Sequence, residues 1–355
     1  MSSPQVPLRD AIRTLPAYVP GARAAAQPDV IKLSSNENPF PPLESVREAV
    51  ARAAVEINRY PDMFATELGE AIAERHGVVP QAVVPGCGSV AVLGHVLQAF
   101  CDAGDEVVHV WRSFEAYPIA VRLTGAVAVT VPLRADGRHD LAAMAAAITP
   151  RTRVVLVCSP NNPTGPAVRD DELRTFLAAV PPEVLVVLDE AYVEFVRDPL
   201  APAGDRILAD HPNVVLLRTF SKAYGLAGLR VGYAVTHPDL ARGVRTAATP
   251  FGVSHLAQVA ALASLRATDE LLERVEVIVE RRAALLAGLR GQGWSVPESQ
   301  ANFVWLATGD RTAERAAEAA RAGLLVRPFA GEGLRISVGE EESVERVLAL
   351  TGTWR

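Results

Sequence analysis

Short runs of hydrophobic residues alternate with stretches of helical length through the middle of the chain. The runs that predict strands are EVVHV (106–110), AVAVTV (126–131), RVVLVC (153–158), VLVVLD (184–189), NVVLL (213–217) and VGYAV (231–235). Between several of them lie helical patterns, such as residues 170–180. Runs that are apolar throughout are typical of strands that helices cover on both faces. The pattern therefore predicts a layered α/β domain with a mostly parallel sheet.

The last third of the chain has a different pattern. Residues 269–290 carry apolar side chains at a helical period with charged residues opposite, which predicts a long amphipathic helix. Strand-like runs follow at 302–306, 324–329 and 334–338, with helices between and after them. We expect a smaller α+β domain in this part of the chain.

These patterns divide the chain into three parts. Residues 1–39 form a proline-rich arm, which we expect to pack across the small domain as irregular chain. Residues 40–250 form the large domain and residues 251–355 the small one. The length of 355 residues agrees with two domains, because one domain takes ~150 residues.

Composition and charge narrow the classes of function. Hydrophobic residues make up 49% of the chain and charged residues 21%, which is the balance of a soluble globular protein. The formal charge is -6 without a basic cluster, which argues against nucleic acid or an anionic membrane as a partner. Because the chain shows neither a signal-peptide core nor the ~18 apolar residues of a membrane helix, we expect a cytoplasmic protein. The scattered histidines and cysteines give no metal signature.

Lysine is nearly absent from the chain. Among the 35 lysines and arginines, only Lys32 and Lys222 are lysines. A position that keeps lysine in such a chain indicates a need for an amine that can lose its proton, although chance survival is the alternative interpretation. Lys222 is the stronger candidate, because it follows a predicted strand and lies among hydroxyl side chains, shortly before Arg230.

Polar side chains follow the predicted strands at their carboxyl ends, where open α/β sheets bind ligands. The segments are SPNNPTG (159–165), DEAY (189–192) and RTFSKA (218–223). In addition, GCGS (86–89) precedes a helix-like stretch whose first N–H groups suit an anion. Together they supply the set that pyridoxal 5'-phosphate requires: an amine for a Schiff base, a carboxylate for the pyridine nitrogen and an anion site for the phosphate.

Taken in order, SPNNPTG, DEAYVEF and TFSKAYGLAGLRVGY resemble the motifs of the fold-type I pyridoxal-phosphate aminotransferases, in the histidinol-phosphate aminotransferase group. The resemblance covers nearly the whole chain, including LSSNENPFPP, NRYPD (58–62), SQANFVW (299–305) and GLRISVG. It implies a large domain with a mostly parallel seven-stranded sheet, a smaller α+β domain and a homodimeric transaminase that acts on amino acids and 2-oxo acids.

The resemblance also implies catalytic and cofactor-binding roles. Lys222 would hold the cofactor covalently and transfer the substrate proton, and Asp189 would pair with the pyridine nitrogen. Asn162 and Tyr192 would donate to the phenolic oxygen of the ring, and Tyr192 would also belong to the catalytic set. The remaining cofactor contacts would come from Gly88, Ser89, Val90, Phe114, Thr219, Ser221 and Arg230, and from Tyr60 reaching into the neighbouring subunit.

Substrate-binding residues follow from the same resemblance. Arg335 matches the arginine that binds the substrate carboxylate, and Asn162 would assist it. Tyr18 and Asn36 lie in the arm that covers the substrate in this family, with a packing role as the alternative. Arg327 is a further candidate, for which a structural ion pair is an equal alternative. The sequence leaves open whether the bond from Asn162 to the following proline is cis.

One segment departs from the histidinol-phosphate pattern. Where those enzymes usually show a P-T-Y-x-x-Y-like segment, this chain has WRSFEAYP (111–118), and Phe114 lacks the hydroxyl of the usual tyrosine. With GCGSV, this segment resembles the actinobacterial aromatic (phenylalanine) aminotransferase branch, which favours aromatic substrates with 2-oxoglutarate as the acceptor. The alternatives are a histidinol-phosphate aminotransferase, a pyridoxal-phosphate decarboxylase of the same fold and a non-catalytic cofactor-binding module.

Overall fold

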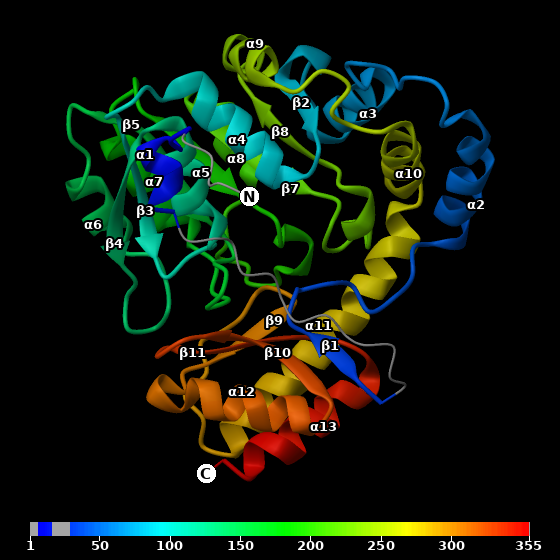
Figure 1. The fold of residues 1–355 in the computed structure, drawn as a ribbon, viewed down its shortest axis with the longest axis vertical. Helices are drawn as coiled ribbons and strands as arrows, with labels where there is room; N and C mark the ends of the chain where they lie inside the picture. Colours follow the sequence, from blue (N-terminus) through cyan, green and yellow to red (C-terminus); the bar gives the residue numbers. More distant parts are fainter. Residues whose placement is uncertain (1–5, 16–28, 355) are drawn as a thin grey trace.

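The computed structural model describes residues 6–15 and 29–354, which form two lobes (Figure 1). The larger lobe is built on a seven-stranded sheet of order β2-β8-β7-β6-β5-β3-β4. Its strands are β2 (Val83–Gly86), β3 (Glu106–Trp111), β4 (Val127–Pro132), β5 (Thr152–Cys158), β6 (Leu185–Asp189), β7 (Val214–Thr219) and β8 (Gly232–Thr236). Strand β8 runs in the direction opposite to the other strands of this sheet, which all run the same way. The prediction of a mostly parallel sheet is therefore confirmed.

Helices cover both faces of this sheet. Those of the larger lobe are α2 (Glu44–Ala53), α3 (Thr66–His76), α4 (Ser89–Phe100), α5 (Ala116–Thr124), α6 (Leu141–Ala146), α7 (Asp170–Ala179), α8 (Gly204–Asp210), α9 (Pro238–Ala247) and α10 (His255–Arg266). Successive side chains of β6 enter different cores: Val186 and Leu188 pack in one, and Val187 in the other. Two buried faces explain why the central strands are apolar throughout.

The smaller lobe is a four-stranded sheet of order β1-β10-β11-β9. Its elements are β1 (Ile31–Leu33), β9 (Phe303–Leu306), β10 (Leu324–Phe329), β11 (Gly333–Ser337), α12 (Thr312–Arg321) and α13 (Glu341–Gly352). Because β1 pairs in parallel with β10, this part of the arm is a strand, which corrects the expectation of irregular chain. The short α1 (Asp10–Arg13) lies near α5 of the larger lobe, where Arg122 Nη2 donates to Thr14 Oγ1 over 2.6 Å, so residues 6–15 do not follow the predicted path across the small domain.

The long helix α11 (Thr268–Gly291) connects the lobes (Figure 1). Its first half packs in the core of the larger lobe through Leu271, Val275 and Ile278. Its second half packs in the core of the smaller lobe through Leu285, Leu286 and Leu289. Since α10 also packs on α2 and α3, we propose that the domain boundary lies within α11 rather than at residue 250.

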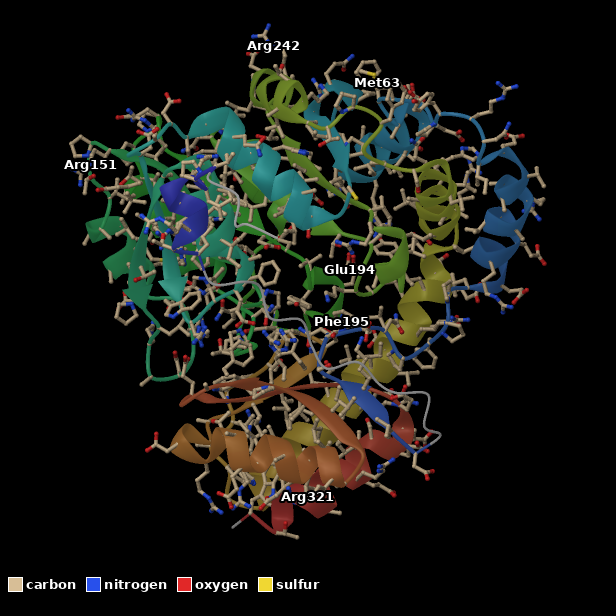
Figure 2. All side chains as sticks on the ribbon, viewed as in Figure 1. Met63, Arg151, Glu194, Phe195, Arg242 and Arg321 are labelled. Carbon is tan, nitrogen blue, oxygen red and sulfur yellow. The ribbon has the colours of Figure 1, made fainter. Side chains whose placement is uncertain are left out.

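Charged side chains lie mainly on the outside of both lobes. In Figure 2, Arg151, Arg242 and Arg321 project from the periphery, whereas Glu194 and Phe195 lie near the middle of the molecule. Within the described residues no helix is both long and apolar enough to cross a membrane. The same residues contain no group of three histidine, cysteine or acidic side chains that could hold a metal ion.

Candidate active site

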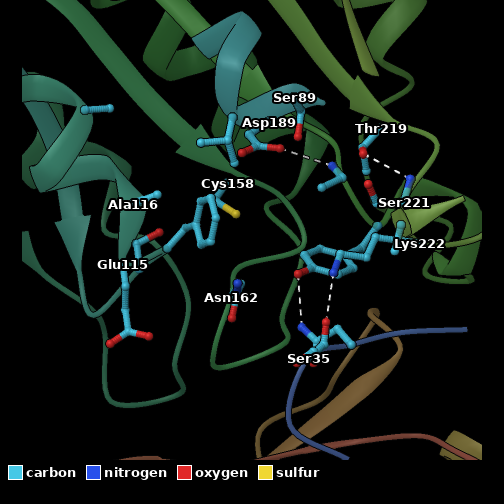
Figure 3. Close-up of a pocket in the computed structure, with 18 of the residues that line it drawn as sticks. Ser35, Ser89, Glu115, Ala116, Cys158, Asn162, Asp189, Thr219, Ser221 and Lys222 are labelled. Carbon is cyan, nitrogen blue, oxygen red and sulfur yellow. Dashed lines mark hydrogen bonds between the residues drawn. The ribbon is translucent and has the colours of Figure 1, made fainter. Parts of the chain in front are cut away.

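A cavity of about 590 Å³ lies at the carboxyl ends of β5, β6 and β7, against β10 and β11 of the smaller lobe. Most of the site residues predicted from the sequence line it, as Figure 3 shows for several of them. They are Asn36, Ser89, Val90, Phe114, Asn162, Asp189, Tyr192, Thr219, Ser221, Lys222, Arg230, Arg327 and Arg335. The position is the one expected for ligands of open α/β sheets.

The amine of Lys222 faces the cavity from the turn that follows β7. The turn is fixed locally, because the backbone N–H of Ser221 donates to Thr219 Oγ1 over 3.1 Å. Nζ of Lys222 donates to the backbone carbonyl of Ser35 over 3.0 Å. Burial and then the positive charge of Arg335 lower the pKa of Lys222 to about 7. A substantial share of this amine is therefore neutral and nucleophilic at neutral pH.

The carboxylate of Asp189, the last residue of β6, is 5% exposed. The Tyr117 hydroxyl donates to Oδ2 over 2.7 Å, and the backbone N–H of Ala191 donates to Oδ1 over 3.2 Å. Burial raises the pKa of Asp189 to about 6, and these two hydrogen bonds oppose the rise. The site thus keeps a fixed carboxylate that gains stability from a cationic partner.

The first turn of α4 and the guanidinium of Arg230 form an anion cradle. Arg230 Nη1 lies 3.3 Å from Ser221 Oγ, and Ser89 and Val90 begin the helix, where N–H groups lack intrahelical acceptors. Gly88 has φ +81°, and a Cβ there would lie 2.5 Å from Arg230 Nη2. A Cβ on Gly232 would lie equally close to the Ser89 nitrogen, at 2.5 Å. Both glycines are therefore required for this close approach.

The opposite wall of the cavity joins the two lobes through hydrogen bonds. Arg335 donates from Nη1 to Asn162 Oδ1 over 2.7 Å and from Nη2 to the Ser34 carbonyl over 2.6 Å. Asn36 Nδ2 donates to the Tyr192 hydroxyl over 3.0 Å. Burial raises the pKa of Tyr192, so the phenol stays protonated. The peptide bond between Asn162 and the following proline is cis.

Three predicted residues stand apart from this group. Gly88 does not line the cavity and acts by allowing the approach of Arg230. Tyr60 is 84% exposed and packs against the ring of Phe251, with ring centroids 4.8 Å apart, away from the cavity of its own chain. Tyr18 lies outside the described residues.

The sequence did not identify three residues that contact predicted members of the site. Tyr117 binds Asp189, Ser35 binds Lys222, and Glu115 pairs with Arg327 Nη2 at 2.6 Å. Phe114 packs edge-on against Tyr117, with ring centroids 5.6 Å apart at 82°. Tyr117 and Glu115 both belong to WRSFEAYP (111–118), the segment that departs from the histidinol-phosphate pattern. The sequence therefore indicated this segment, but it did not show which residues these two side chains contact.

Comparisons with known proteins identify the family of this chain. The family model described as "Aminotransferase class I and II" matches residues 28–350. The aromatic amino acid aminotransferase of Streptomyces avermitilis is 55% identical over 356 aligned residues, covering 100% of this chain and 99% of that one. The protein of the same name from Thermobifida fusca is 54% identical, over 98% of this chain and 97% of that one.

Solved structures show the same fold. The histidinol-phosphate aminotransferase of Sinorhizobium meliloti, solved in complex with pyridoxal-5'-phosphate, has a TM-score of 0.86 at 31% identity, covering 96% of this chain and 95% of that one. The aspartate aminotransferase of Thermus thermophilus with maleate has a TM-score of 0.80 at 27% identity, covering 92% and 91%. The predicted fold-type I architecture is therefore confirmed, and the chain belongs to the class I and II aminotransferase family.

Proposed function

We propose that this aminotransferase converts an aromatic L-amino acid and 2-oxoglutarate into the aromatic 2-oxo acid and L-glutamate. The observation that carries the proposal is the cavity itself, in which Lys222, Asp189 and Arg335 meet beside apolar side chains of α5. The aromatic preference is supported by the names of the full-length relatives and by Phe114, which gives this part of the cavity an apolar ring.

The residues of the site fit pyridoxal 5'-phosphate. When bound, this cofactor supplies an electron sink for the carbanion that forms at the substrate Cα. Asp189 would pair with the protonated pyridine nitrogen. This positive charge would offset the free-energy cost of burying the carboxylate. The anion cradle at Gly88, Ser89 and Arg230 would hold the phosphate.

Hydrogen-bond polarity supports the placement of the ring oxygen. Asn162 accepts from Arg335 through Oδ1, which leaves its Nδ2 amide to donate. The Tyr192 hydroxyl accepts from Asn36, which leaves its proton to donate. Two donors are thus directed by their neighbours toward an acceptor such as the phenolic oxygen of the cofactor.

Lys222 would bind the cofactor covalently and then serve as the base. Its lowered pKa leaves the released amine able to take the Cα proton and to return a proton in the second half of the reaction. Arg335 would bind the substrate carboxylate through a pair of parallel hydrogen bonds, exchanging the Asn162 and Ser34 oxygens that it now contacts.

We propose a homodimer as the active form, with Tyr60 completing the cofactor site of the neighbouring subunit. Its surroundings are an exposed apolar surface of a kind that marks interfaces, comprising Val55, Ile57, Tyr60, Met63, Phe64 and Phe251. Tyr60→Phe is expected to leave the mass in solution unchanged and to weaken cofactor binding by roughly tenfold. A location in the cytoplasm stays a prediction from the sequence.

The test of the proposed function is product analysis with purified holoenzyme. Phenylalanine and 2-oxoglutarate should give phenylpyruvate and glutamate in equal amounts, and Lys222→Ala should reduce turnover by ~1000-fold or more. A Lys222→Ala variant that transaminates at the wild-type rate would contradict the proposal. Release of CO2 from the substrate would instead identify a decarboxylase.

A further inference from the structure

We infer that Glu115 is a specificity-determining residue: as the internal counter-ion of Arg327, it makes the side-chain end of the substrate cavity select uncharged aromatic side chains over anionic ones. This inference rests on the proposed function, because it concerns which amino acids the same cavity accepts. It follows from the way in which two arginines and one carboxylate are arranged across the two lobes.

The two arginines face the cavity from adjacent strands. Arg327 of β10 lies directly opposite Arg335 of β11 in the antiparallel register, so their side chains emerge on the same face. Both line the cavity. Nη1 and Nη2 of Arg335 contact the site oxygens of Asn162 and Ser34, which are the contacts a substrate carboxylate would replace. The second arginine, left without a counter-charge, would attract a second anionic group.

Glu115 supplies that counter-charge. Its Oε2 lies 2.6 Å from Arg327 Nη2, and the side chains are 30% exposed for Glu115 and 8% for Arg327. Taking a guanidinium this far out of water is costly unless a carboxylate accompanies it. Glu115 also occupies the N-cap position of α5, where the helix dipole favours a negative charge. The Glu115 side chain is therefore positioned beside Arg327 both by the ion pair and by its place at the start of α5.

The surroundings of this ion pair suit an aromatic ring. Apolar residues of α5, of the loop before it and of β10 also line the cavity: Phe114, Ala116, Ile119, Ala120, Leu123 and Phe329. Figure 3 shows Glu115 at the α5 side of the pocket, across from Lys222. An aromatic side chain can occupy this region while the ion pair stays closed. An anionic side chain that takes the place of Glu115 at Arg327 Nη2 leaves the Glu115 carboxylate without this partner. Glutamate and 2-oxoglutarate, although they are the proposed co-substrates, therefore bind at a cost that an aromatic side chain does not carry.

The matched control is a second ion pair between the same two segments. Arg112, just before Glu115, pairs with Glu332 in the turn between β10 and β11, through two nitrogens, yet neither residue lines the cavity. Glu332→Gln therefore loosens the contact between the lobes without changing the charge inside the cavity. Glu115→Gln removes charge from the cavity and keeps the size of the side chain.

The experiment compares two unreactive ligands of the holoenzyme: 3-phenylpropionate, with an uncharged side chain, and glutarate, with an anionic one. In Glu115→Gln, the ratio of glutarate affinity to 3-phenylpropionate affinity should rise on the order of tenfold, as expected for an added charged hydrogen bond. Glu332→Gln should leave the ratio unchanged. Arg327→Gln should lower the ratio, and this second variant tests the same ion pair should Glu115→Gln fail to fold.

Single-turnover rates provide the catalytic counterpart. The kcat/KM for L-glutamate relative to L-phenylalanine should rise by a similar factor, on the order of tenfold, in Glu115→Gln. An unchanged ratio in Glu115→Gln, or an equal rise in Glu332→Gln, would overturn the role of Glu115. Failure of the wild-type enzyme to transaminate phenylalanine would be a separate result, since it would refute the proposed function while the ligand-affinity ratio still reports on Glu115.

Discussion

The hydroxyl of Tyr117 donates a hydrogen bond to Oδ2 of Asp189 over 2.7 Å. Tyr117 is fully buried, and its ring lies between Phe114 and His109. The phenol thus fixes the carboxylate that the proposed cofactor needs, while the Ala191 N–H fixes the other oxygen. Because both contacts favour the ionised carboxylate, they oppose the effect of burial on its pKa.

Tyr117→Phe should weaken cofactor binding. Loss of the phenol removes a hydrogen bond to a buried charge, which raises the pKa of Asp189 further and lowers its value as a partner for a cation. We expect cofactor affinity and kcat/KM each to fall roughly tenfold, measured by titrating the cofactor-free protein and by steady-state kinetics. Tyr224→Phe, at a buried ring that packs on Phe220, is the control and should change neither.

The amine of Lys222 should titrate near neutrality in the cofactor-free protein. Burial lowers its pKa to about 7 from the ordinary 10.5 of lysine. Acetylation by a limiting reagent, followed by mass spectrometry of the peptide that contains Lys222, should therefore give a half-maximal rate near pH 7. Arg335→Met removes the nearby positive charge and should move the midpoint upward. A midpoint near the ordinary lysine value in the wild-type protein would show that the amine is not desolvated.

Asp189 should destabilise the cofactor-free protein above pH 6. Its pKa is raised from 3.8 to about 6, so between these values the folded chain holds a proton that the unfolded chain has released. Stability therefore falls as pH rises through this range. Asp189→Asn should be more stable than the wild type at pH 7 to 8, by roughly 3 kcal/mol, with the difference vanishing below about pH 4. Urea unfolding at several pH values measures this, and equal stability at pH 8 would contradict it.

A buried ion pair behind the site should contribute to stability. Glu190, whose side chain is 3% exposed, pairs with Arg218 at 2.7 Å. Removing one partner leaves the other charge buried and unpaired, so Glu190→Gln and Arg218→Met should each lower the free energy of unfolding by about 3–5 kcal/mol. The double variant should lose less than the sum of the two. Additive losses in thermal unfolding would show that the two side chains do not act as a pair.

The parts of the fold that the sequence predicted are those with a strong local signal. The central strands were placed to within about two residues, because both faces are buried and the runs are apolar throughout. The edge strands β1 and β2 were missed. Both are short, and β2 ends in Pro85 and Gly86, residues that weaken a strand signal and are tolerated at a sheet edge.

The same distinction holds in the site. Lys222, Asp189 and Asn162 were identified because each lies in a motif at the end of a strand. The roles of Tyr117 and Glu115 depend on contacts with residues 72 and 212 positions away, Asp189 and Arg327, which only the fold brings together. The sequence left an ion pair open as an alternative role for Arg327. It did not identify Glu115 as the partner, because the two residues belong to different lobes.

The most direct test of aromatic specificity is a half-reaction with the holoenzyme. The rate at which the cofactor absorbance changes would be measured as a function of substrate concentration, separately for L-phenylalanine and for L-histidinol phosphate. We expect phenylalanine to react with a kcat/KM at least ~100-fold higher, because Arg335 is placed to bind a carboxylate through two hydrogen bonds and histidinol phosphate carries a larger phosphate ester in place of that carboxylate. A preference for histidinol phosphate would contradict the proposed substrate and assign the protein to the other branch of its family.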